Sequence, residues 1–296
     1  MALPSATPVS VAASSSAVPP WNLWNGQDRK RGVILRAGEY LGVADGRWEL
    51  GGVTVTSTRY APLRRQSRHR HENPTYFFLI GGEFCDVSSE LGSRYPQRFE
   101  LLFHPAGAWH EGVSGESGRF GLNIEPSVEW LAGFGLEAAD LGEYRVDSDP
   151  VRGCELLRLA NAGMPGEWAA DQILEILLPL EPVATEGPDW LKRLDSLLFA
   201  SDEVRWGLRS LAHELGVHPV YLARVFRQRY RCSVTQWLLR RRLLEAARGL
   251  LKGRAASGVA HQAGFADQSH FGRAFRSYLE LTPGHFQRRW AEWVAR

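Results

Sequence analysis

The sequence predicts an α+β protein of two modules: an N-terminal β-barrel of the jelly-roll type with added helices, and a C-terminal module made only of helices. Short aromatic and β-branched runs broken by Gly and Pro dominate residues 21–128, whereas the chain after Trp190 has helical periodicity. The charge divides in the same way. Residues 190–296 hold 19 Lys+Arg against 8 Asp+Glu, and the remainder holds 16 against 25. A basic module therefore follows an acidic one.

Three observations argue against a secreted or membrane protein. Residues 1–20 are small, uncharged and rich in Ser, Ala and Pro, without the basic start and apolar core of a signal peptide, and they predict a disordered tail. The chain contains no run of about 18 apolar residues, so we expect no membrane span. Cys85, Cys154 and Cys232 lie far apart, which fits a reducing cytoplasm better than a disulfide framework.

Residues 21–128 carry the signals of strands and turns. Val53 and Val55 alternate with threonines, and residues 75–84 and 99–104 are apolar runs that Gly and Pro interrupt. Several short strands of this kind predict a barrel or sandwich.

Residues 129–180 change to helical spacing, with helices predicted at 151–162 and 167–178. The second of these helices has a strongly apolar stripe, for which packing against the barrel and a dimer seam are equally good explanations. The stripe consists of Ile173, Leu174, Leu177 and Leu178. Residues 181–189, with two prolines and a glycine, predict a linker.

The basic module contains a repeat. After a helix predicted at 190–200, the segment LAHELGVHPVYLARVFR (211–227) recurs as VAHQAGFADQSHFGRAFR (259–276), with one inserted residue. Each copy is a short apolar segment, a glycine, a polar break and a second segment with arginines, which is the sequence form of a helix-turn-helix. We expect these two units at about 208–230 and 257–279.

In each unit the second helix has one apolar face and one polar face. Apolar residues spaced by four predict the buried face. They are Leu222, Phe226 and Tyr230 in the first unit, and Phe271, Phe275 and Leu279 in the second. The polar faces are predicted to bind DNA. Their residues are Val220, Ala223, Arg224, Arg227, Gln228, Gln268, Ser269, Gly272, Arg273 and Arg276.

The chemistry of these side chains suggests two roles. Arginine can donate two hydrogen bonds to guanine and glutamine can do the same for adenine, which is worth about 1–3 kcal/mol of base discrimination. Because a recognition helix presents its N-terminal residues to base edges, we predict base contacts for Arg224, Gln268 and Arg273. Arg227 and Arg276, three residues further along, are predicted to contact phosphate and position the module.

The helix predicted between the units, at 233–251, determines their spacing. Ser233 and Gln236 have the spacing of a capping box, and Gly253 lies just past the predicted end. Such a helix extends about 28 Å, close to the ~34 Å that separates successive major grooves on one face of DNA. One monomer is therefore expected to fill two adjacent major grooves.

The residues of the basic module resemble a known family. Residues 190–296 are similar to the DNA-binding domain of AraC/XylS-type transcriptional regulators through LAHELGVHPVYLARVFR, RRLLEAARGLL and GFADQSHFGRAFRSYLELTPGHFQRR. The resemblance implies a bilobed domain of seven helices with two recognition helices in adjacent major grooves. Residues 254–259, RAASGV, depart from the isoleucine-rich helix start of the family. Because Ala-Ser-Gly is a poor helix start, we expect a less rigid second unit.

The acidic module contains two small histidine clusters. His69 and His71 face the same side if they lie on a strand, and PAGAWH at 105–110 suits a tight turn followed by His110. Together they are similar to the two cupin motifs. A cupin-like barrel before the DNA-binding domain is also the arrangement that the AraC resemblance implies.

The cupin resemblance implies a metal site formed by His69, His71 and His110 with a glutamate four or five residues beyond His71. Thr75 and Tyr76 occupy those positions, so the carboxylate is missing. Three imidazoles can still hold zinc or iron, and an organic-effector pocket or packed core histidines remain alternatives. The candidate pocket residues, each of which core packing also explains, are His69, His71, Tyr76, Phe78, Trp109 and His110.

We therefore predict a transcriptional regulator rather than an enzyme. It would bind promoter DNA in a sequence-specific way as a cytoplasmic homodimer, associated with the nucleoid when bound, and a small-molecule effector in the barrel would shift its DNA-competent population. RNA polymerase is a further expected partner if the protein activates transcription, the commoner mode of the family; no cofactor is required and no membrane partner is expected. The alternatives are a metal-dependent cupin enzyme with an accessory DNA-binding domain and a nonspecific nucleoid protein.

Overall fold

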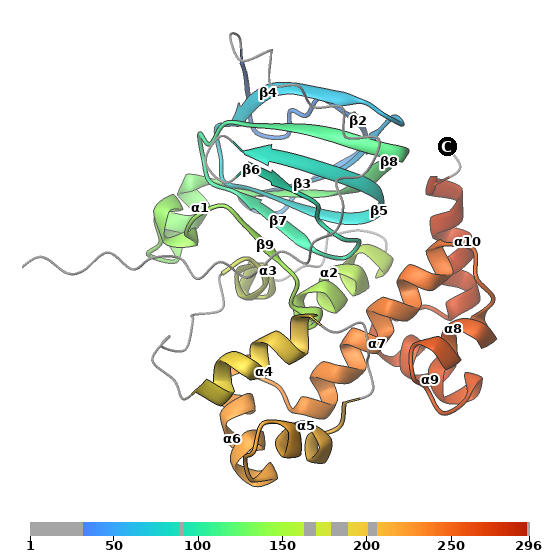
Figure 1. Ribbon diagram of the computed structural model, residues 1–296. Helices are drawn as coiled ribbons and strands as arrows, with labels where there is room; N and C mark the ends of the chain where they lie inside the picture. Colours follow the sequence, from blue (N-terminus) through green and yellow to red (C-terminus); the bar gives the residue numbers. More distant parts are fainter. Residues whose placement is uncertain (1–31, 89–91, 163–169, 179–188, 201–205, 295–296) are drawn as a thin grey trace, which may run out of the picture.

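The computed structural model describes residues 32–88, 92–162, 170–178, 189–200 and 206–294 (Figure 1). The predicted tail at 1–20 lies outside the described residues, as does the predicted linker apart from Asp189. The described chain forms a curled β-sheet, helices that cover one face of the sheet, and a helical module beyond those helices (Figure 1). The predicted fold class is confirmed in this form.

In the described part of the N-terminal module, nine strands form one sheet. They are β1 (Val33–Leu35), β2 (Val43–Glu49), β3 (Val53–Tyr60), β4 (Arg65–His71), β5 (Thr75–Ser88), β6 (Gly92–Arg94), β7 (Leu101–His104), β8 (His110–Pro126) and β9 (Arg145–Asp147). On one side β8 pairs with β5 along most of its length. On the other side its first half pairs with β4 and its second half with β3. This division of partners curls the sheet into a half-barrel.

The two longest strands bend together at a glycine. The register between β5 and β8 shifts around Gly81 and Gly82. Gly82 has φ +80°, and a Cβ atom there would lie 2.0 Å from the carbonyl oxygen of Gly118. Glycine is therefore required for the close approach of the two strands, and the bulge helps the sheet to curl.

The two faces of the sheet differ in polarity. Tyr76 and Phe78 of β5 belong to the largest hydrophobic cluster, together with the helices, whereas Phe77 between them points into the half-barrel. The interior face is otherwise rich in buried polar side chains. These are Thr58, Gln66, His69, His71, Asp86, His104, His110, Arg119, Asn123 and Glu125. One face thus forms the core and the other lines the half-barrel.

Three helices and a strand follow the long strands of the barrel. The helices are α1 (Val128–Gly133), α2 (Pro150–Ala162) and α3 (Ala170–Leu177), with a 3-10 turn at Ala138–Leu141. The predicted helices at 151–162 and 167–178 correspond to α2 and α3. The short strand β9 in this region is not predicted from the sequence, because three residues are too few to show a strand pattern; it forms by pairing with β7.

The apolar stripe of α3 packs against the barrel. Ile173 and Leu177 are buried in the same cluster as Phe78, and Leu174 and Leu178 pack against that cluster. The Tyr76 hydroxyl also donates a hydrogen bond of 2.9 Å to the Leu177 carbonyl oxygen. The chain itself therefore covers Ile173 and Leu177 and packs against Leu174 and Leu178, as expected for packing against the barrel.

The described residues of the C-terminal module form seven helices. They are α4 (Asp189–Ala200), α5 (Leu208–Glu214), α6 (Pro219–Tyr230), α7 (Val234–Leu251), α8 (Ala256–Gln262), α9 (Gln268–Leu279) and α10 (Pro283–Val294). The ranges of α4 and α7 agree with the helices predicted at 190–200 and 233–251 to within a residue, and α5–α6 and α8–α9 agree equally well with the two predicted units. None of the described helices has the length and apolar character needed to cross a membrane.

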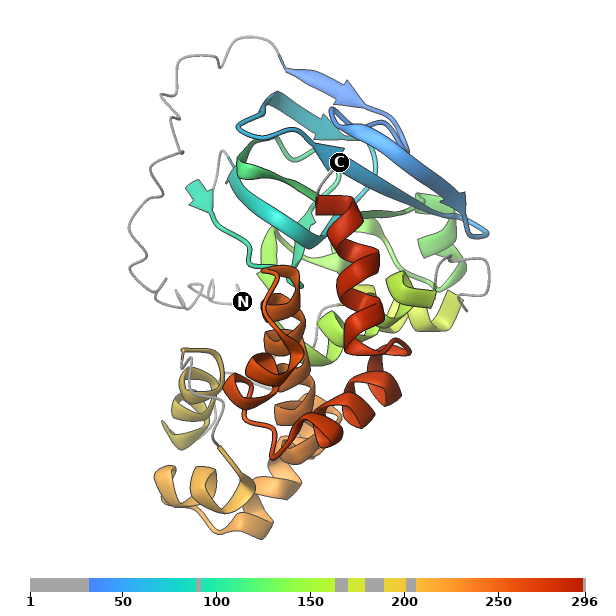
Figure 2. The same ribbon diagram turned by 90° about the vertical axis from the view of Figure 1, so that its right-hand side faces the viewer.

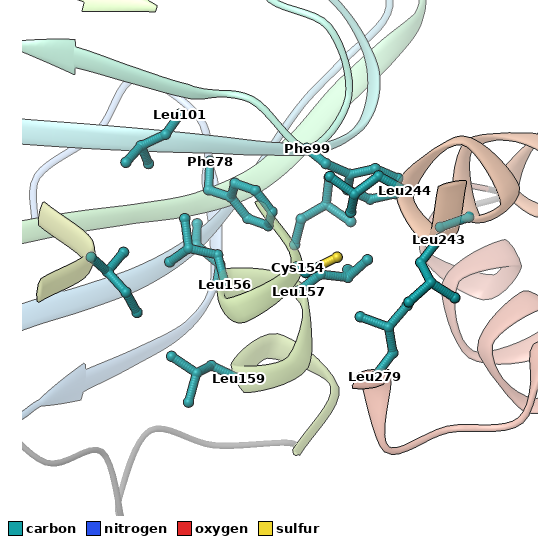
Figure 3. Packing of buried hydrophobic residues seen from close by; sticks show 14 of the residues in the cluster. Phe78, Phe99, Leu101, Cys154, Leu156, Leu157, Leu159, Leu243, Leu244 and Leu279 are labelled. Carbon is teal, nitrogen blue, oxygen red and sulfur yellow. The ribbon is translucent and has the colours of Figure 1, made fainter. Parts of the chain in front are cut away.

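The seven helices form two lobes with different cores. The first lobe has its own cluster around Leu222, Phe226 and Trp237. The second lobe, with Phe271 and Phe275, belongs to the cluster that also contains the outer face of the sheet. Figure 3 shows how α2 lies between the sheet and α7 in this shared core. The second lobe is therefore continuous with the barrel.

Asn161, at the end of α2, connects the barrel side to the second lobe by hydrogen bonds. Its side chain donates to the Leu279 carbonyl oxygen (3.0 Å) and accepts from the Trp290 indole (2.9 Å). The Trp290 ring also stacks on Phe120 of β8, with centroids 5.9 Å apart. Figure 2 shows the C-terminal helix rising beside the sheet as these contacts require.

We expect Asn161→Ala to lower the free energy of unfolding by about 2–6 kcal/mol, because two buried groups lose their partner at about 1–3 kcal/mol each. Urea denaturation measures this change. The control is Glu280→Ala, which removes the exposed Arg158–Glu280 ion pair (3.1 Å) between the same two elements. That pair should contribute less than about 1 kcal/mol. Equal effects of the two substitutions would contradict the role given to Asn161.

Candidate DNA-binding surface and buried histidine cluster

The first helix-turn-helix unit is formed by α5 and α6. Gly216, just after α5, has φ +67°, a conformation that glycine adopts without strain. Pro219 opens α6 at its first position, where its missing N–H costs nothing. The His218 side chain accepts a hydrogen bond of 3.3 Å from the Val220 backbone N–H. The turn and the start of α6 are therefore determined by neighbouring residues.

The rear face of α6 is anchored to the first lobe. Leu222, Phe226 and Tyr230 are buried, as the spacing by four predicts. Asp195 of α4 accepts hydrogen bonds from the Arg229 guanidinium (2.6 Å) and from the Tyr230 hydroxyl. Burial, with the Asp195 carboxylate beside it, raises the pKa of Tyr230, so the phenol remains protonated and donates.

The opposite face of α6 is open to solvent. Val220 is 70% exposed, and the arginines predicted to contact DNA are exposed as well. A shallow surface hollow lies along this face. It is lined by Val220, Ala223, Arg224, Arg227, Gln228 and Arg231. Sequence reasoning missed Arg231, because the apolar periodicity stops at Tyr230 and nothing in the pattern shows that the next residue returns to the same face.

The second unit repeats this construction. Gly264 after α8 has φ +76°, and Asp267 caps α9 by accepting a hydrogen bond of 2.7 Å from the His270 backbone N–H. That hydrogen bond lowers the pKa of Asp267. The predicted apolar stripe is buried, and the polar face is left outward. The exposed residues are Gln268, Ser269, Arg273 and Arg276, with Gly272 half-buried.

One helix, α7, connects the two units. Its start is a capping box in which Ser233 Oγ accepts from the Gln236 N–H (3.2 Å) and Gln236 Oε1 accepts from the Ser233 N–H (3.0 Å). Gly253 follows its end with φ +76°. The 18 residues of α7 extend about 27 Å. The units α5–α6 and α8–α9 lie at opposite ends of this helix (Figure 1).

Four imidazoles come together inside the half-barrel. His69 and His71 on β4 and His110 on β8 meet as the two motifs predicted, with potential ligand atoms within 4.8 Å of one another. His104 on β7 joins them, its ring stacked on His110 with centroids 3.7 Å apart. Its Nε2 lies 3.1 Å from Oδ2 of Asp86 on β5. All five side chains are buried.

Hydrogen bonds and burial determine the protonation of the imidazole rings of His69, His71 and His110. His69 Nδ1 donates to the Ser67 carbonyl oxygen (2.8 Å) and His110 Nδ1 to that of Ala108 (3.3 Å). Burial lowers the pKa of His69 to about 4 and holds the pKa values of His71 and His110 well below the usual range. At neutral pH these rings are therefore uncharged, and Nε2 of His69 and of His110 keeps a lone pair.

Sequence reasoning missed His104 and Asp86. His104 directly precedes the second motif, so its position was a weak signal, but no spacing rule connects it with Asp86. The two residues come from different strands, and strand pairing brings them together. His104 of β7 lies opposite Thr75 of β5. Asp86 lies further along β5, opposite Gly112 of β8.

Comparisons with known proteins agree with the helix-turn-helix geometry. Residues 211–289 match a family model described as "Helix-turn-helix domain". The chain is 30% identical over 100 residues to "Probable transcription factor PqrA" of Proteus vulgaris, a match that spans 33% of this chain and 80% of that protein. The chain belongs to the AraC/XylS family of transcriptional regulators.

Two further proteins are similar to this AraC-family regulator. "HTH-type transcriptional activator RhaS" of Pectobacterium atrosepticum is 28% identical over 173 residues, which is 55% of this chain and 60% of that protein. Among solved structures, unsaturated-fatty-acid-bound ToxT of Vibrio cholerae is similar over 82% of this chain and 97% of that chain, with 10% identity and a TM-score of 0.37.

Three predicted pocket residues of this regulator do not face the imidazoles. Tyr76 and Phe78 lie on the face of β5 opposite to Thr75, which pairs with His104, and both pack in the helix-covered core. Trp109 lies against Arg68 and Arg70, which alternate with the histidines along β4. The guanidinium carbons of the two arginines are 4.6 and 4.9 Å from the centroid of the Trp109 ring. Core and surface packing therefore explain all three residues.

In this AraC-family regulator, Asp195→Ala should lower the free energy of unfolding by about 1–3 kcal/mol, because the buried Tyr230 hydroxyl loses its acceptor. The measurement is urea denaturation. The control from the same helix is Arg193→Ala, which removes an exposed ion pair with Glu214 (3.3 Å) and should change stability by less than about 1 kcal/mol. If the control destabilises the protein as much as Asp195→Ala, the anchoring role of Asp195 is wrong.

Proposed function

We propose that this AraC-family regulator binds promoter DNA by inserting α6 and α9 into two adjacent major grooves. The observation that carries the proposal is the pair of exposed, arginine-bearing helix faces at opposite ends of α7 (Figure 1). The length of α7, about 27 Å, is close to the ~34 Å between successive major grooves on one side of DNA. Both faces also carry two arginines at the same spacing, which fits two related modes of contact.

The positions along each helix support different roles for these side chains. Arg224, Gln268 and Arg273 lie in the first half of their helices and are proposed to contact base edges. Arg227 and Arg276 lie one turn further along and are proposed to contact phosphate. The remaining contact residues of the two faces are Val220, Ala223, Gln228, Ser269 and Gly272.

The interior of the half-barrel is the proposed effector site. Among the described residues, buried polar atoms without a hydrogen-bond partner include Thr56 Oγ1, His71 Nδ1, Asp86 Oδ1, Ser114 Oγ and Arg119 Nε. A buried polar group without a partner costs about 1–3 kcal/mol, which a polar ligand or water would recover. An effector bound here shifts the DNA-competent population only by its differential affinity for the two states.

The regulator is also proposed to have protein partners and a cellular place of action. RhaS carries the description "transcriptional activator", and we propose that this regulator also activates transcription, with RNA polymerase as partner. It would act in the cytoplasm as a homodimer and associate with the nucleoid when bound to DNA. The dimer surface would lie outside the α3 stripe, which the barrel covers.

DNA binding itself requires no cofactor, but the histidine cluster suits a divalent transition metal ion. The neutral imidazoles of His69, His71 and His110 are the donors that zinc and iron accept. His71 Nδ1, which has no hydrogen-bond partner and lies 3.8 Å from Glu125 Oε1, fits such a site. When bound, the ion would supply a Lewis-acidic point that orients an effector. The chain's own residues would hold it and exclude water around it.

The same cluster favours a second candidate, a metal-dependent cupin enzyme with an accessory DNA-binding domain. Metal analysis of the purified protein, followed by removal of the metal, separates the two functions. Because DNA binding itself requires no metal, a regulator that senses through this site should change its effector response when the metal is removed. Unchanged DNA binding together with the loss of a catalytic activity would favour the enzyme.

The proposed roles of the paired arginines predict different effects on specificity. Arg273→Ala should relax base preference, with a loss of about 1–3 kcal/mol on a selected site, because a base contact disappears. Arg276→Ala should weaken binding to all sequences and reduce the salt dependence by about one phosphate contact. Affinity would be measured on a selected site and on random DNA at several salt concentrations.

The control is Arg288→Ala, an exposed arginine on α10 that lies outside both recognition helices in the sequence, which should leave both affinities unchanged. Identical behaviour of Arg273→Ala and Arg276→Ala would sink the division into base and phosphate contacts. Equal affinity of the unmodified protein for selected and random DNA would instead indicate a nonspecific nucleoid protein.

A further inference from the structure

The two recognition helices end in the same left-handed backbone conformation. Arg231 directly follows α6 with φ +55°, and Glu280 directly follows α9 with φ +59°. The two residues occupy the same place in the repeat, seven positions after Arg224 and Arg273 respectively. Glycine is the usual residue at such a helix end, because a Cβ atom strains the left-handed conformation. Each unit therefore carries a charged side chain where the backbone favours none.

The two side chains have opposite charges and different surroundings. Glu280 pairs with Arg158 of α2 at 3.1 Å, so the second unit uses this position to attach to the helices of the barrel. Arg231 is exposed, and no hydrogen bond or ion pair joins its side chain to another residue of the described chain. The helix α6 lies at the end of the molecule opposite to the sheet (Figure 1). A contact within the chain thus explains Glu280 but not Arg231.

Arg231 instead belongs to the face of α6 that is proposed to bind DNA. It lines the surface hollow of α6 together with Arg224 and Arg227, and none of the six residues that line this hollow is acidic. The three guanidinium groups therefore face the same open space with no carboxylate among the lining residues. Closely spaced cations of this kind suit the phosphate groups of DNA, which carry one negative charge each.

We propose that Arg231 is a further phosphate-binding residue of the first unit, at the end of α6. The inference rests on the proposed insertion of α6 into a major groove, in which the N-terminal part of the helix meets the base edges. An arginine just past the other end of the helix can then form charge-assisted hydrogen bonds with the DNA backbone.

The two units then contribute unequally to DNA affinity. The second unit lacks this phosphate contact, because Glu280 has the opposite charge and pairs with Arg158. The first unit therefore supplies a larger share of the salt-dependent, sequence-independent affinity than the second.

The test measures the affinity of the full chain for a selected site and for random DNA at several salt concentrations. Arg231→Gly should weaken binding to both and reduce the slope of log affinity against log salt by about 0.9, the value of one phosphate contact. Between about 50 and 200 mM salt, its affinity should therefore fall about 3.5-fold less than that of the unmodified protein. Its thermal midpoint should stay unchanged or rise, because glycine relieves the left-handed strain. Arg231→Lys, which keeps the charge, should retain the slope.

The matched control is Glu280→Gly, the same substitution at the equivalent backbone position of the second unit, which should not weaken DNA binding. A cation at a helix C-terminus can also stabilise the helix itself. If that were the only role of Arg231, Arg231→Gly would lower the thermal midpoint and leave the salt slope unchanged, which would overturn the inference. A loss of affinity confined to the selected site, or equal weakening by Glu280→Gly, would overturn it as well.

Failure of the proposed function gives a different result. The absence of any DNA binding by the folded, unmodified protein would defeat the proposed function and this inference with it. Equal affinity of the unmodified protein for all sequences would defeat sequence-specific binding alone, since the salt slope of Arg231→Gly still tests the phosphate contact. Specific binding by the unmodified protein, with the same salt slope in Arg231→Gly, overturns this inference alone.

Discussion

The rest of the structure depends on the packing of α2 between the sheet and the helical module. Phe78 and Phe99 of the sheet side, Leu157 of α2 and Leu244 of α7 belong to one continuous core (Figure 3). The approach is close: a Cβ atom at Gly153 would lie 2.8 Å from the Phe99 carbonyl oxygen and 2.9 Å from Leu244 Cδ1. Because protein interiors are close-packed, a displacement of the sheet must move α7 or open a cavity.

This constraint acts differently on the two recognition helices. The lobe that carries α9 shares the core of the barrel, and Trp290 both stacks on Phe120 and bonds to Asn161. The lobe that carries α6 has a separate core around Phe226 and Trp237, against which Val151 of α2 packs. A change inside the half-barrel therefore reaches α9 through a shared core, and α6 through α7 and the first turn of α2. The spacing and relative orientation of the two helices are the quantities that an effector would have to change.

The packing of the helices on one face of the sheet also explains the polar interior. Side chains alternate along a strand, so when one face of the sheet packs in the helix-covered core, the other face is left for functional residues. His69 and His71 could be placed on one side from their spacing, and His110 from its turn motif. His104 and Asp86 could not be placed in this way. They meet across β5, β7 and β8, and no local sequence pattern predicts how these strands pair. Their contact is the main addition of the structure to the site.

The sequence by itself determined the helical module, because its signals act over one helical turn. Gly216, Ser233 and Asp267 end or start helices through bonds to neighbours within a few residues. Only the tertiary structure decided which face of β5 meets the histidines, what covers the α3 stripe, and why α8 forms from a poor start. Val259 of α8 packs so closely on Gly249 that a Cβ atom there would lie 3.0 Å away. These outcomes depend on register and on contacts between distant segments, and a slip of one residue along a strand would exchange its faces.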